Sequence, residues 1–414
     1  MLIRGNRVVV TGLGVVAPNG IGKAAFWSSL LEGRSGIKAI TSFDASEHPS
    51  RIGGEIQDFH AALHLGPHIN AKRLARQTQL ALAAAFEAVA DAALTPGLFE
   101  GKRSVPLVLG VGSSAVEVIA SSMAHLLKRG PRHMHVHSAL ACHPHQAASI
   151  LAQYLPYISQ GTTTGSACTA GMDSINDAAG FIRTGKAEAA LCGGTDAPIN
   201  ALTYAAMAAS GLLSVRNDAP GKACRPFDLD RDSGIVSDGA AILILENLDH
   251  ALARGRRPYL EVTGFATHVD THPEEPGTGW EFTMREALAN AGRRPDSVDY
   301  LCAHAPGHPL IDRIETAMIK KVFGAYAYRL PISSIKGVIG SPLSAAGPMQ
   351  VIACALALQE GVIPSTLNLE KPDPACDLNY LPGPPRRLQP DVILINTHGL
   401  GGGNSSLVVE RWRP

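Results

Sequence analysis

The stretch Thr164-Gly-Ser-Ala-Cys-Thr-Ala-Gly171 surrounds one cysteine, Cys168, with small residues. Apolar residues then recur with helical spacing, at Met172, Ile175, Ala179 and Ile182. The cysteine is therefore predicted to lie at the N-terminus of a helix, after a sharp turn that the small residues permit. The positive end of the helix dipole favours a thiolate, which is the nucleophilic form of cysteine. A small buried structural cysteine is the plainer alternative.

Strand-like and helix-like segments alternate on both sides of this stretch. Strands are predicted at 7–16, 105–111, 189–192, 240–245, 259–264, 298–303 and 391–396, and helices at 77–93, 280–291, 311–322 and 350–358. The continuous apolar run Ala240–Leu245 is expected of a strand covered on both faces. Alternation of this kind favours an α/β architecture.

A weak internal repeat accompanies the alternation. Gly165-Ser166 precedes Ala170-Gly171-Met172, and Gly340-Ser341 precedes Ala346-Gly347-Pro348-Met349. Each pattern opens a predicted helix and is followed by an apolar strand and a glycine-rich turn. The sequence thus predicts two related halves, 1–255 with the cysteine and 256–414, with a seam near 250–258.

Composition limits the kind of partner and compartment. The 414 residues are 45% hydrophobic and 17% charged, as in a globular protein. Lys+Arg 36 balances Asp+Glu 36, which argues against nucleic acid or an anionic membrane as the main partner. There is no apolar run of transmembrane length and no signal-peptide pattern at the N-terminus. Seven dispersed cysteines favour reduced thiols, so we expect a cytoplasmic protein.

Several motifs occur in one order along almost the whole chain. They are Arg7–Gly14, Phe26–Leu31 with Ser35-Gly36-Ile37, Gly165–Gly171, Cys224-Arg-Pro-Phe-Asp228, Lys336–Gly347 and Asn396–Asn404. In this order they resemble the elongating β-ketoacyl-(acyl carrier protein) synthases. The resemblance implies the thiolase fold: two related α/β halves in a layered α-β-α-β-α arrangement.

The resemblance also implies a reaction and its partners. Cys168 would take an acyl chain from a carrier thioester, and malonyl-carrier would lose carbon dioxide and attack the acyl-enzyme, in fatty-acid or polyketide synthesis. The expected partner is an acyl carrier protein with a phosphopantetheine thioester. A homodimer is expected, or a heterodimer with a related synthase. No cofactor and no metal is expected.

Two histidines normally donate hydrogen bonds to the enolate in this family, and here only the first matches, at His304. The second position holds Ser341, which can donate one hydrogen bond but cannot become cationic near neutral pH. The family's glutamate that partners the active-site lysine is matched by Gln350, while Lys336 itself is retained. Two ionisable residues of the family's active site, the second histidine and the glutamate, are therefore both replaced by uncharged residues here.

Other departures surround the same pocket. Pro306 and His308 replace family threonines that contact the pantetheine arm, and His398 and Leu400 replace phenylalanines on either side of Gly399. By resemblance, the residue at 398 gates the acyl chain, and its backbone N–H is expected to join that of Cys168 in an oxyanion hole. We hypothesise that the imidazole of His398 partly replaces the missing second histidine; a role confined to reshaping the gate is the alternative.

Two further functions stay open from the sequence. Ser341, Gln350, Pro306 and His308 would suit an acyltransferase or thioesterase-like enzyme that loads Cys168 without condensing. A structural partner subunit of a synthase heterodimer is the third possibility, which the presence of Cys168 opposes.

Two weaker signals point elsewhere. Gly12-x-Gly14-x-x-Ala17 after a strand fits a dinucleotide fingerprint, but Pro18-Asn19-Gly20 follows where a phosphate-binding helix should run. The histidines between His133 and His145 resemble a metal cluster by composition, without familiar ligand spacing. We therefore predict neither a nucleotide nor a metal.

Overall fold

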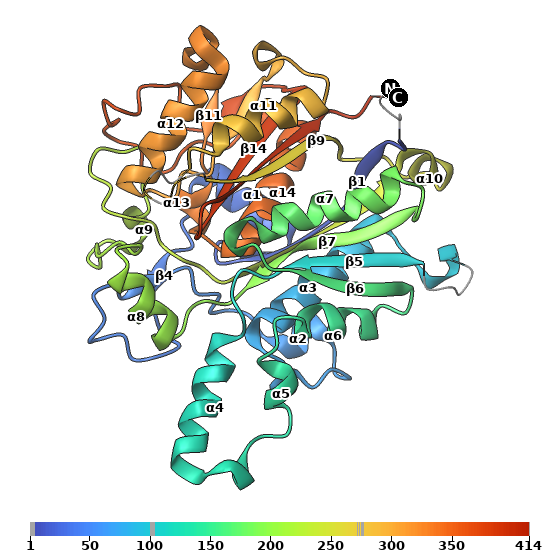
Figure 1. The fold of residues 1–414 in the computed structure, drawn as a ribbon, viewed down its shortest axis with the longest axis vertical. Coiled ribbons are helices and arrows are strands. Elements are labelled where there is room, and N and C mark those ends of the chain that lie inside the picture. The colour runs from blue at the N-terminus through green and yellow to red at the C-terminus, as the bar shows by residue number, and fades with distance from the viewer. Residues whose placement is uncertain (1–4, 100–103, 271, 273, 275–276, 414) are drawn as a thin grey trace.

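A mixed β-sheet with helices on its outer faces and between its two halves forms the framework of the protein (Figure 1). The computed structural model describes residues 5–99, 104–270, 272, 274 and 277–413. The strands of the first half, in spatial order, are β6 (Ile158–Thr164), β5 (Val105–Gly110), β7 (Ala189–Asp196), β8 (Gly239–Asn247) and β1 (Val8–Ala17). Those of the second half are β11 (Ile332–Ser333), β10 (Tyr300–Cys302), β14 (Val392–Gly399), β15 (Gly403–Glu410) and β9 (Leu260–Val269).

The two halves repeat one topology. In each, the three strands farthest from the junction are parallel, and the remaining pairs are antiparallel. The halves join where β1 pairs with β9, at Val9 with Glu261 and Val10 with Leu260. This repetition confirms the predicted arrangement of two related α/β halves.

Helices complete the layers. The longer ones are α1 (Lys23–Glu32), α3 (Arg76–Ala92), α4 (Val116–Arg129), α6 (Gln146–Tyr154), α7 (Ala170–Arg183), α8 (Ala201–Ala209), α11 (Trp280–Asn290), α12 (Pro309–Phe323) and α14 (Ala346–Glu360). Short elements are β2 (Gly20–Ile21), β3 (Lys38–Ala39), β4 (Ile52–Gly53), β12 (Val362–Ile363), β13 (Arg386–Arg387), α2 (Ala61–Leu65), α5 (Ser138–Ala141), α9 (Pro220–Ala223), α10 (Leu248–Ala253) and α13 (Lys336–Ile339).

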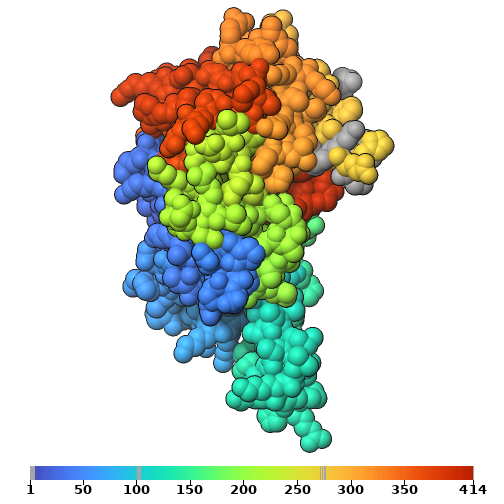
Figure 2. All heavy atoms as spheres, turned by 90° about the vertical axis from the view of Figure 1, so that its left-hand side faces the viewer, coloured from blue at the N-terminus to red at the C-terminus, as the bar shows by residue number. Residues whose placement is uncertain are grey.

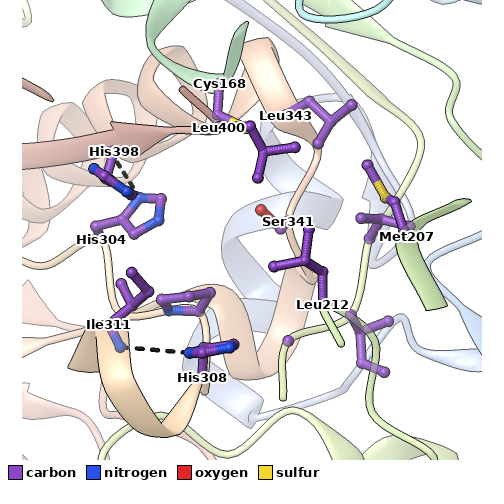
Figure 3. A pocket seen from close by; sticks show the side chains of 14 residues that line it. Cys168, Met207, Leu212, His304, His308, Ile311, Ser341, Leu343, His398 and Leu400 are labelled. Carbon is purple, nitrogen blue, oxygen red and sulfur yellow. Dashed lines mark hydrogen bonds between the residues drawn. The ribbon is translucent and has the colours of Figure 1, made fainter. Parts of the chain in front are cut away.

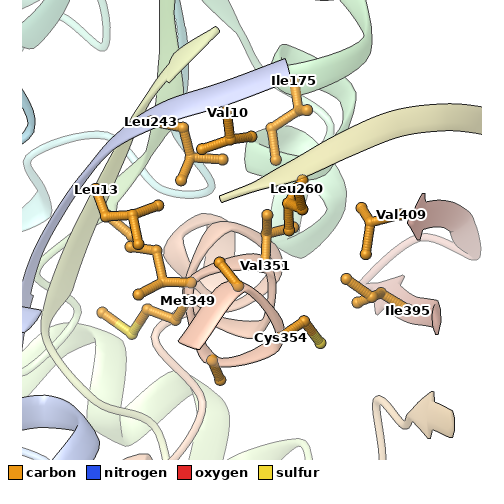
Figure 4. Close-up of a cluster of buried hydrophobic side chains, with 14 of the residues drawn as sticks. Val10, Leu13, Ile175, Leu243, Leu260, Met349, Val351, Cys354, Ile395 and Val409 are labelled. Carbon is orange, nitrogen blue, oxygen red and sulfur yellow. The ribbon is translucent and has the colours of Figure 1, made fainter. Parts of the chain in front are cut away.

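Three apolar clusters correspond to the layers. The largest lies between the two halves of the sheet and includes side chains of α7 and α14 (Figure 4). A second cluster joins α3 and α6 to the outer face of the first half, and a third joins α11 and α12 to the outer face of the second. Because α14 is covered on every side, its residues from Ala346 to Leu358 are all buried, and the helix is apolar all round.

The glycines of the dinucleotide-like pattern have a packing role. Gly12 and Gly14 lie inside β1, which continues to Ala17 instead of ending in a phosphate-binding turn. A Cβ on either glycine would overlap a carbonyl oxygen of α3, that of Ala88 or Ala84. The two glycines therefore let the helix approach the strand closely.

An arm made of α4 and α5 projects from the first half (Figures 1 and 2). No residue of α4 is buried, and the arm exposes large apolar side chains, among them Leu127 at 80% and Val136 at 85%. Nearby, β6 is the last strand of the sheet, with Ser159, Gln160 and Thr162 exposed. Within the described residues, no helix is both long and apolar enough to cross a bilayer.

Candidate active site

The predicted nucleophile lies on a tight turn between β6 and α7. Residues Ala167–Thr169 form one 3₁₀ turn, and α7 begins at Ala170. Ala167 has a φ of 54°, a left-handed conformation that costs a residue with a Cβ energy. The hydroxyl of Thr169 donates to the carbonyl of Ser166 at 2.8 Å and helps to hold this turn. The sequence thus placed Cys168 correctly, one turn before the regular helix.

The protonation state of Cys168 differs from the expectation of a favoured thiolate. Burial raises the pKa of the thiol to about 11, which outweighs the lowering by the N–H groups of Leu400 and of Cys168 itself and by Lys336. The helix end is real, but withdrawing the sulfur of the half-buried Cys168 from water disfavours its charged form more strongly. Cys168, the candidate nucleophile, is therefore a thiol at rest.

His304 lies directly after β10 and is held by its own backbone. Glu315 on α12 accepts the N–H groups of His304 and Ala305 at 2.9 and 2.8 Å. The ring nitrogen Nδ1 of His304 lies 3.1 Å from the backbone nitrogen of His398, which donates to it, and 3.1 Å from Nζ of Lys336. With Nδ1 as acceptor, the ring hydrogen is on Nε2. Burial, helped by Lys336 and His398, keeps the pKa of His304 well below its ordinary value, so the ring is neutral.

Lys336 and Gln350 lie behind His304. Nζ of Lys336 donates to the carbonyl oxygen of His304 as well as to its ring. Burial lowers the pKa of Lys336, while the charge of Glu315 raises it. The amide nitrogen of Gln350 donates to the carbonyls of Cys302, Ala303 and Asn396. Gln350 therefore holds the two strand ends that carry the site.

A single cavity collects most of the predicted residues (Figure 3). Its wall includes Cys168, His304, Pro306, His308, Ser341, His398 and Leu400, together with the apolar residues Met207, Leu212, Gly234, Ile235, Val236, Ile311 and Leu343. The hydroxyl of Ser341 faces the cavity (Figure 3), where it can donate to a bound carbonyl. Lys336 is buried behind this wall.

Pro306 and His308 line the side of the cavity near the start of α12. Nδ1 of His308 accepts the N–H of Leu310 at 3.2 Å and so caps α12, where Pro309 occupies the first helical position. Burial lowers the pKa of His308, and Arg231 lowers it further. The neutral ring therefore has its hydrogen on Nε2.

The end of β14 and the residue after it correct one expectation. The backbone N–H of His398 does not serve an oxyanion hole, because it donates to Nδ1 of His304. The N–H of Leu400, two residues on, interacts with the thiol of Cys168 instead. Gly399 lies between them, where a Cβ would come 3.2 Å from the backbone nitrogen of Cys168. The Leu400 side chain lines the cavity and is 55% exposed.

Sequence reasoning missed the residues that position His398. Its Nδ1 lies 3.0 Å from Oδ1 of the buried Asn404, and Asn404 donates to Asp270 at 2.7 Å. The indole of Trp280 contacts the rings of both His304 and His398, at centroid distances of 5.7 and 5.1 Å. Asn404 stands at the end of a quoted motif, whereas nothing in the sequence marked Asp270.

The histidine-rich segment lies on the arm, away from this cavity. His125 contacts the carbonyl of His133 at 2.8 Å and the ring of His135, while His145 contacts Thr163 of β6. Across the described part of the chain, no group of three or more His, Cys, Asp or Glu side chains is arranged to hold a metal ion.

Comparison with known proteins identifies the family. Residues 5–251 match the family model "Beta-ketoacyl synthase, N-terminal domain", and residues 259–370 match "Beta-ketoacyl synthase, C-terminal domain". The chain belongs to the β-ketoacyl synthase family. It is an acyltransferase of the 3-oxoacyl-(acyl carrier protein) synthase kind, a condensing enzyme of fatty-acid or type II polyketide synthesis.

Relatives of both kinds resemble this synthase over nearly its full length. The chain is 38% identical to 3-oxoacyl-[acyl-carrier-protein] synthase 2 of Synechocystis sp., over 98% of each chain. It is 37% identical to the tetracenomycin polyketide synthase ketoacyl synthase alpha subunit of Streptomyces glaucescens, over 98% of this chain and 97% of that one.

Solved structures agree with the fold. A type II polyketide ketosynthase in complex with its acyl carrier protein, bound to a hexaketide, superposes with a TM-score of 0.91 at 29% identity. The ishigamide ketosynthase/chain length factor superposes with a TM-score of 0.91 at 31% sequence identity. Each covers 99% of this synthase and 100% of the compared chain.

Proposed function

We propose that this synthase carries out the full condensation with one histidine, His304, and one hydroxyl, Ser341, facing the enolate. The observation that carries the proposal is the arrangement of donors around one cavity. The N–H groups of Cys168 and Leu400 interact with the sulfur, and His304 has its hydrogen on Nε2 in the same cavity wall. Donors placed where charge develops are usually the largest single contribution to such catalysis.

In the first half-reaction the sulfur of Cys168 attacks the thioester carbonyl of acyl-carrier. The bond between sulfur and the acyl carbon forms, the bond to the carrier sulfur breaks, and the carrier leaves as a thiol. The N–H groups of Cys168 and Leu400 are suited to hold the oxyanion of the tetrahedral intermediate.

In the second half-reaction malonyl-carrier loses carbon dioxide, and the electron pair of the broken C–C bond moves into an enolate. The enolate oxygen accepts from Nε2–H of His304 and from the hydroxyl of Ser341. Its carbon attacks the acyl group on Cys168, and the sulfur leaves with its electron pair. Because neutral His304 donates without a proton being transferred first, loss of the second histidine weakens the site without removing its function.

We propose an acyl carrier protein as the donor partner and a second copy of the chain as the structural partner. The ketosynthase of similar structure was solved with its carrier protein, and another similar structure is a ketosynthase/chain length factor pair. The open edge of β6 and the apolar arm offer a surface for such pairing. Because Cys168 is present, a purely structural subunit role is disfavoured.

Intact-mass analysis of the protein with acyl-carrier and malonyl-carrier tests the proposal. An acyl adduct that maps to Cys168, together with an elongated β-ketoacyl-carrier, is expected. Cys168→Ala should form neither. An adduct that persists without elongated product contradicts condensation with those carriers and favours transfer of the acyl group to another acceptor.

A further inference from the structure

His398 is held in one tautomer by a chain of hydrogen bonds. The amide nitrogen of Asn404 donates to Asp270 at 2.7 Å, to the carbonyl of Gly402 at 3.0 Å and to that of His268 at 3.3 Å. Three acceptors around this nitrogen fix the amide orientation, so Oδ1 of Asn404 faces His398. Nδ1 of His398, 3.0 Å away, must therefore carry the ring hydrogen.

Asp270 is itself anchored. Its carboxylate accepts the backbone N–H groups of Gly277 and Gly279 at 2.6 and 2.7 Å. The relay thus runs from two backbone donors through Asp270 and Asn404 to the imidazole of His398. A carboxylate at the far end favours the cationic form of a histidine that has taken a proton.

The consequence is that neutral His398 has its lone pair on Nε2. The other two imidazoles of the cavity have the opposite tautomer, because Nδ1 of His304 and Nδ1 of His308 accept backbone N–H groups. Of the imidazoles that line this cavity in the described structure, His398 is thus the one that offers a free acceptor nitrogen. It does not reproduce the donor role of a second histidine unless it is protonated.

The chemistry of Cys168 calls for such an acceptor. Burial keeps its sulfur protonated, so the thiol proton must leave when the sulfur attacks a thioester. His398 and Cys168 line the same cavity, and Leu400, two residues after His398, interacts with the thiol through its backbone N–H. Lys336 is engaged with His304.

We propose that Nε2 of His398 is the general base that removes the Cys168 proton during acyl loading, directly or through one water, and that Asp270 and Asn404 are its positioning residues. The inference rests on the proposed function, because it concerns the first half-reaction of that cycle. The S–H proton passes to Nε2 as the S–C bond forms, and the imidazolium returns it to the departing carrier sulfur. No other reactant is consumed.

The groups around His398 set the pKa of its imidazole. Burial lowers the pKa of His398, Lys336 lowers it further, and the hydrogen bond to Asn404 and the charge of Asp270 raise it. The ring of His304 is also close, at a centroid distance of 5.9 Å, but is neutral. Since the net pKa is below the ordinary value, His398 is already a neutral base at pH 7.

The test is the single-turnover rate of Cys168 acylation by octanoyl-pantetheine, followed by intact mass from pH 6 to 9. The wild-type rate should be nearly flat above pH 7. His398→Phe should be slower at pH 7 by about 100-fold, the lower end of general-base effects. Its rate should then rise about tenfold per pH unit toward the thiol pKa, since hydroxide must form the thiolate. Asp270→Asn should give a smaller loss with an altered pH profile.

Rescue separates a chemical role from a structural one. Added imidazole should restore acylation in His398→Ala but not in Cys168→Ala. If wild type and His398→Phe show the same rate and pH profile, the inference is wrong while the proposed function stands. If wild type forms no adduct at Cys168 at any pH, the proposed function itself fails. Thermal unfolding of each variant identifies any that does not fold, and His398→Gln then replaces it.

Discussion

At the scale of single residues, the direction of each hydrogen bond decides what the site can do. Cys168 is a thiol, His304 is a donor through Nε2, and His398 is an acceptor through Nε2. These assignments follow from which partner each nitrogen already has. In the proposed mechanism the hydroxyl of Ser341 donates where the family resemblance implies a second histidine, so the enolate keeps two donors, one of them unable to become cationic.

The variant Ser341→Ala tests the hydroxyl proposed to donate to the enolate. A neutral hydrogen bond contributes about 1 kcal/mol, so decarboxylation of malonyl-carrier should slow about fivefold. Acylation of Cys168 should be unchanged, since the role proposed for Ser341 is confined to the enolate. Release of labelled carbon dioxide measures the first step, and intact mass measures the second. Equal rates of decarboxylation in variant and wild type would contradict a role of Ser341 in stabilising the enolate.

Asp238 gives a pH-dependent prediction about stability. Burial raises its pKa to about 7, against the opposing charge of Arg76. From about pH 4 to 7 the folded state therefore holds a proton that the unfolded state has lost, and the wild-type free energy of unfolding falls as pH rises. Asp238→Asn cannot bind or release this proton, so its free energy of unfolding does not fall for this reason. Urea unfolding should show the variant gaining about 2–3 kcal/mol on wild type between pH 5 and 7. If the difference in free energy of unfolding between variant and wild type is the same at pH 5 and pH 7, the raised pKa of Asp238 is contradicted.

At the scale of elements, close backbone approaches at glycines position Cys168. Gly171 in the first turn of α7 faces Ser344, just before α14, and Gly399 faces the backbone of Cys168. The three segments lie far apart in the chain, and glycine lets them meet. The sequence predicted α7 and α14 as two helices of a repeat. It could not show that they touch, because helical spacing describes one element at a time.

Two glycines of α7 form a matched pair for testing this contact. A Cβ at Gly171 would overlap the carbonyl oxygen of Ser344, whereas one at Gly180 would meet no atom of the described residues within 4 Å. Gly171→Ala should lower the free energy of unfolding by about 1–3 kcal/mol and slow acylation of Cys168. Gly180→Ala should raise it by up to about 1 kcal/mol, through helix propensity. Chemical denaturation measures both, and equal effects would contradict the contact.

At the scale of the whole molecule, the first half leaves one edge of the sheet open. The strand β6 exposes Ser159, Gln160 and Thr162, and the α4–α5 arm beside it exposes apolar side chains. Apolar surface of this kind on a synthase is expected to be covered by a partner chain. The second half ends in the two-residue strand β11, so the two edges are not equivalent.

Thr162→Lys tests whether two copies meet at this edge. In a symmetric pair the new charge is brought close to its own copy, so the dimer should dissociate at micromolar concentration. Gln359 is exposed at the end of α14, so Gln359→Lys serves as the charge control. This variant should keep the mass of the wild-type dimer in solution. Sedimentation velocity measures the mass. A wild-type monomer at high concentration contradicts the homodimer, and a dimer that persists in Thr162→Lys moves the interface elsewhere.

The fold and the family could be predicted from the sequence, because they depend on local patterns in a fixed order, and the same patterns singled out Cys168 as the candidate nucleophile. Apolar spacing located the strands and helices, and the small residues around Cys168 marked its turn. The boundary between residues 255 and 256 stays a prediction. The motif positions also named His304, Ser341 and Leu400 as residues of one site, and the cavity brings them together.

The protonation states, and the contacts made by His398 and Leu400 at the end of β14, depend on the tertiary structure. The pKa of Cys168 depends on burial and on groups distant in the chain, such as Lys336, and its N–H neighbour is Leu400, not His398 as the resemblance implied. The tautomer of His398 depends on Asp270, which lies on a different segment and which no motif marked. Such properties arise from the direction of a few hydrogen bonds and the exclusion of water, and residue spacing contains neither.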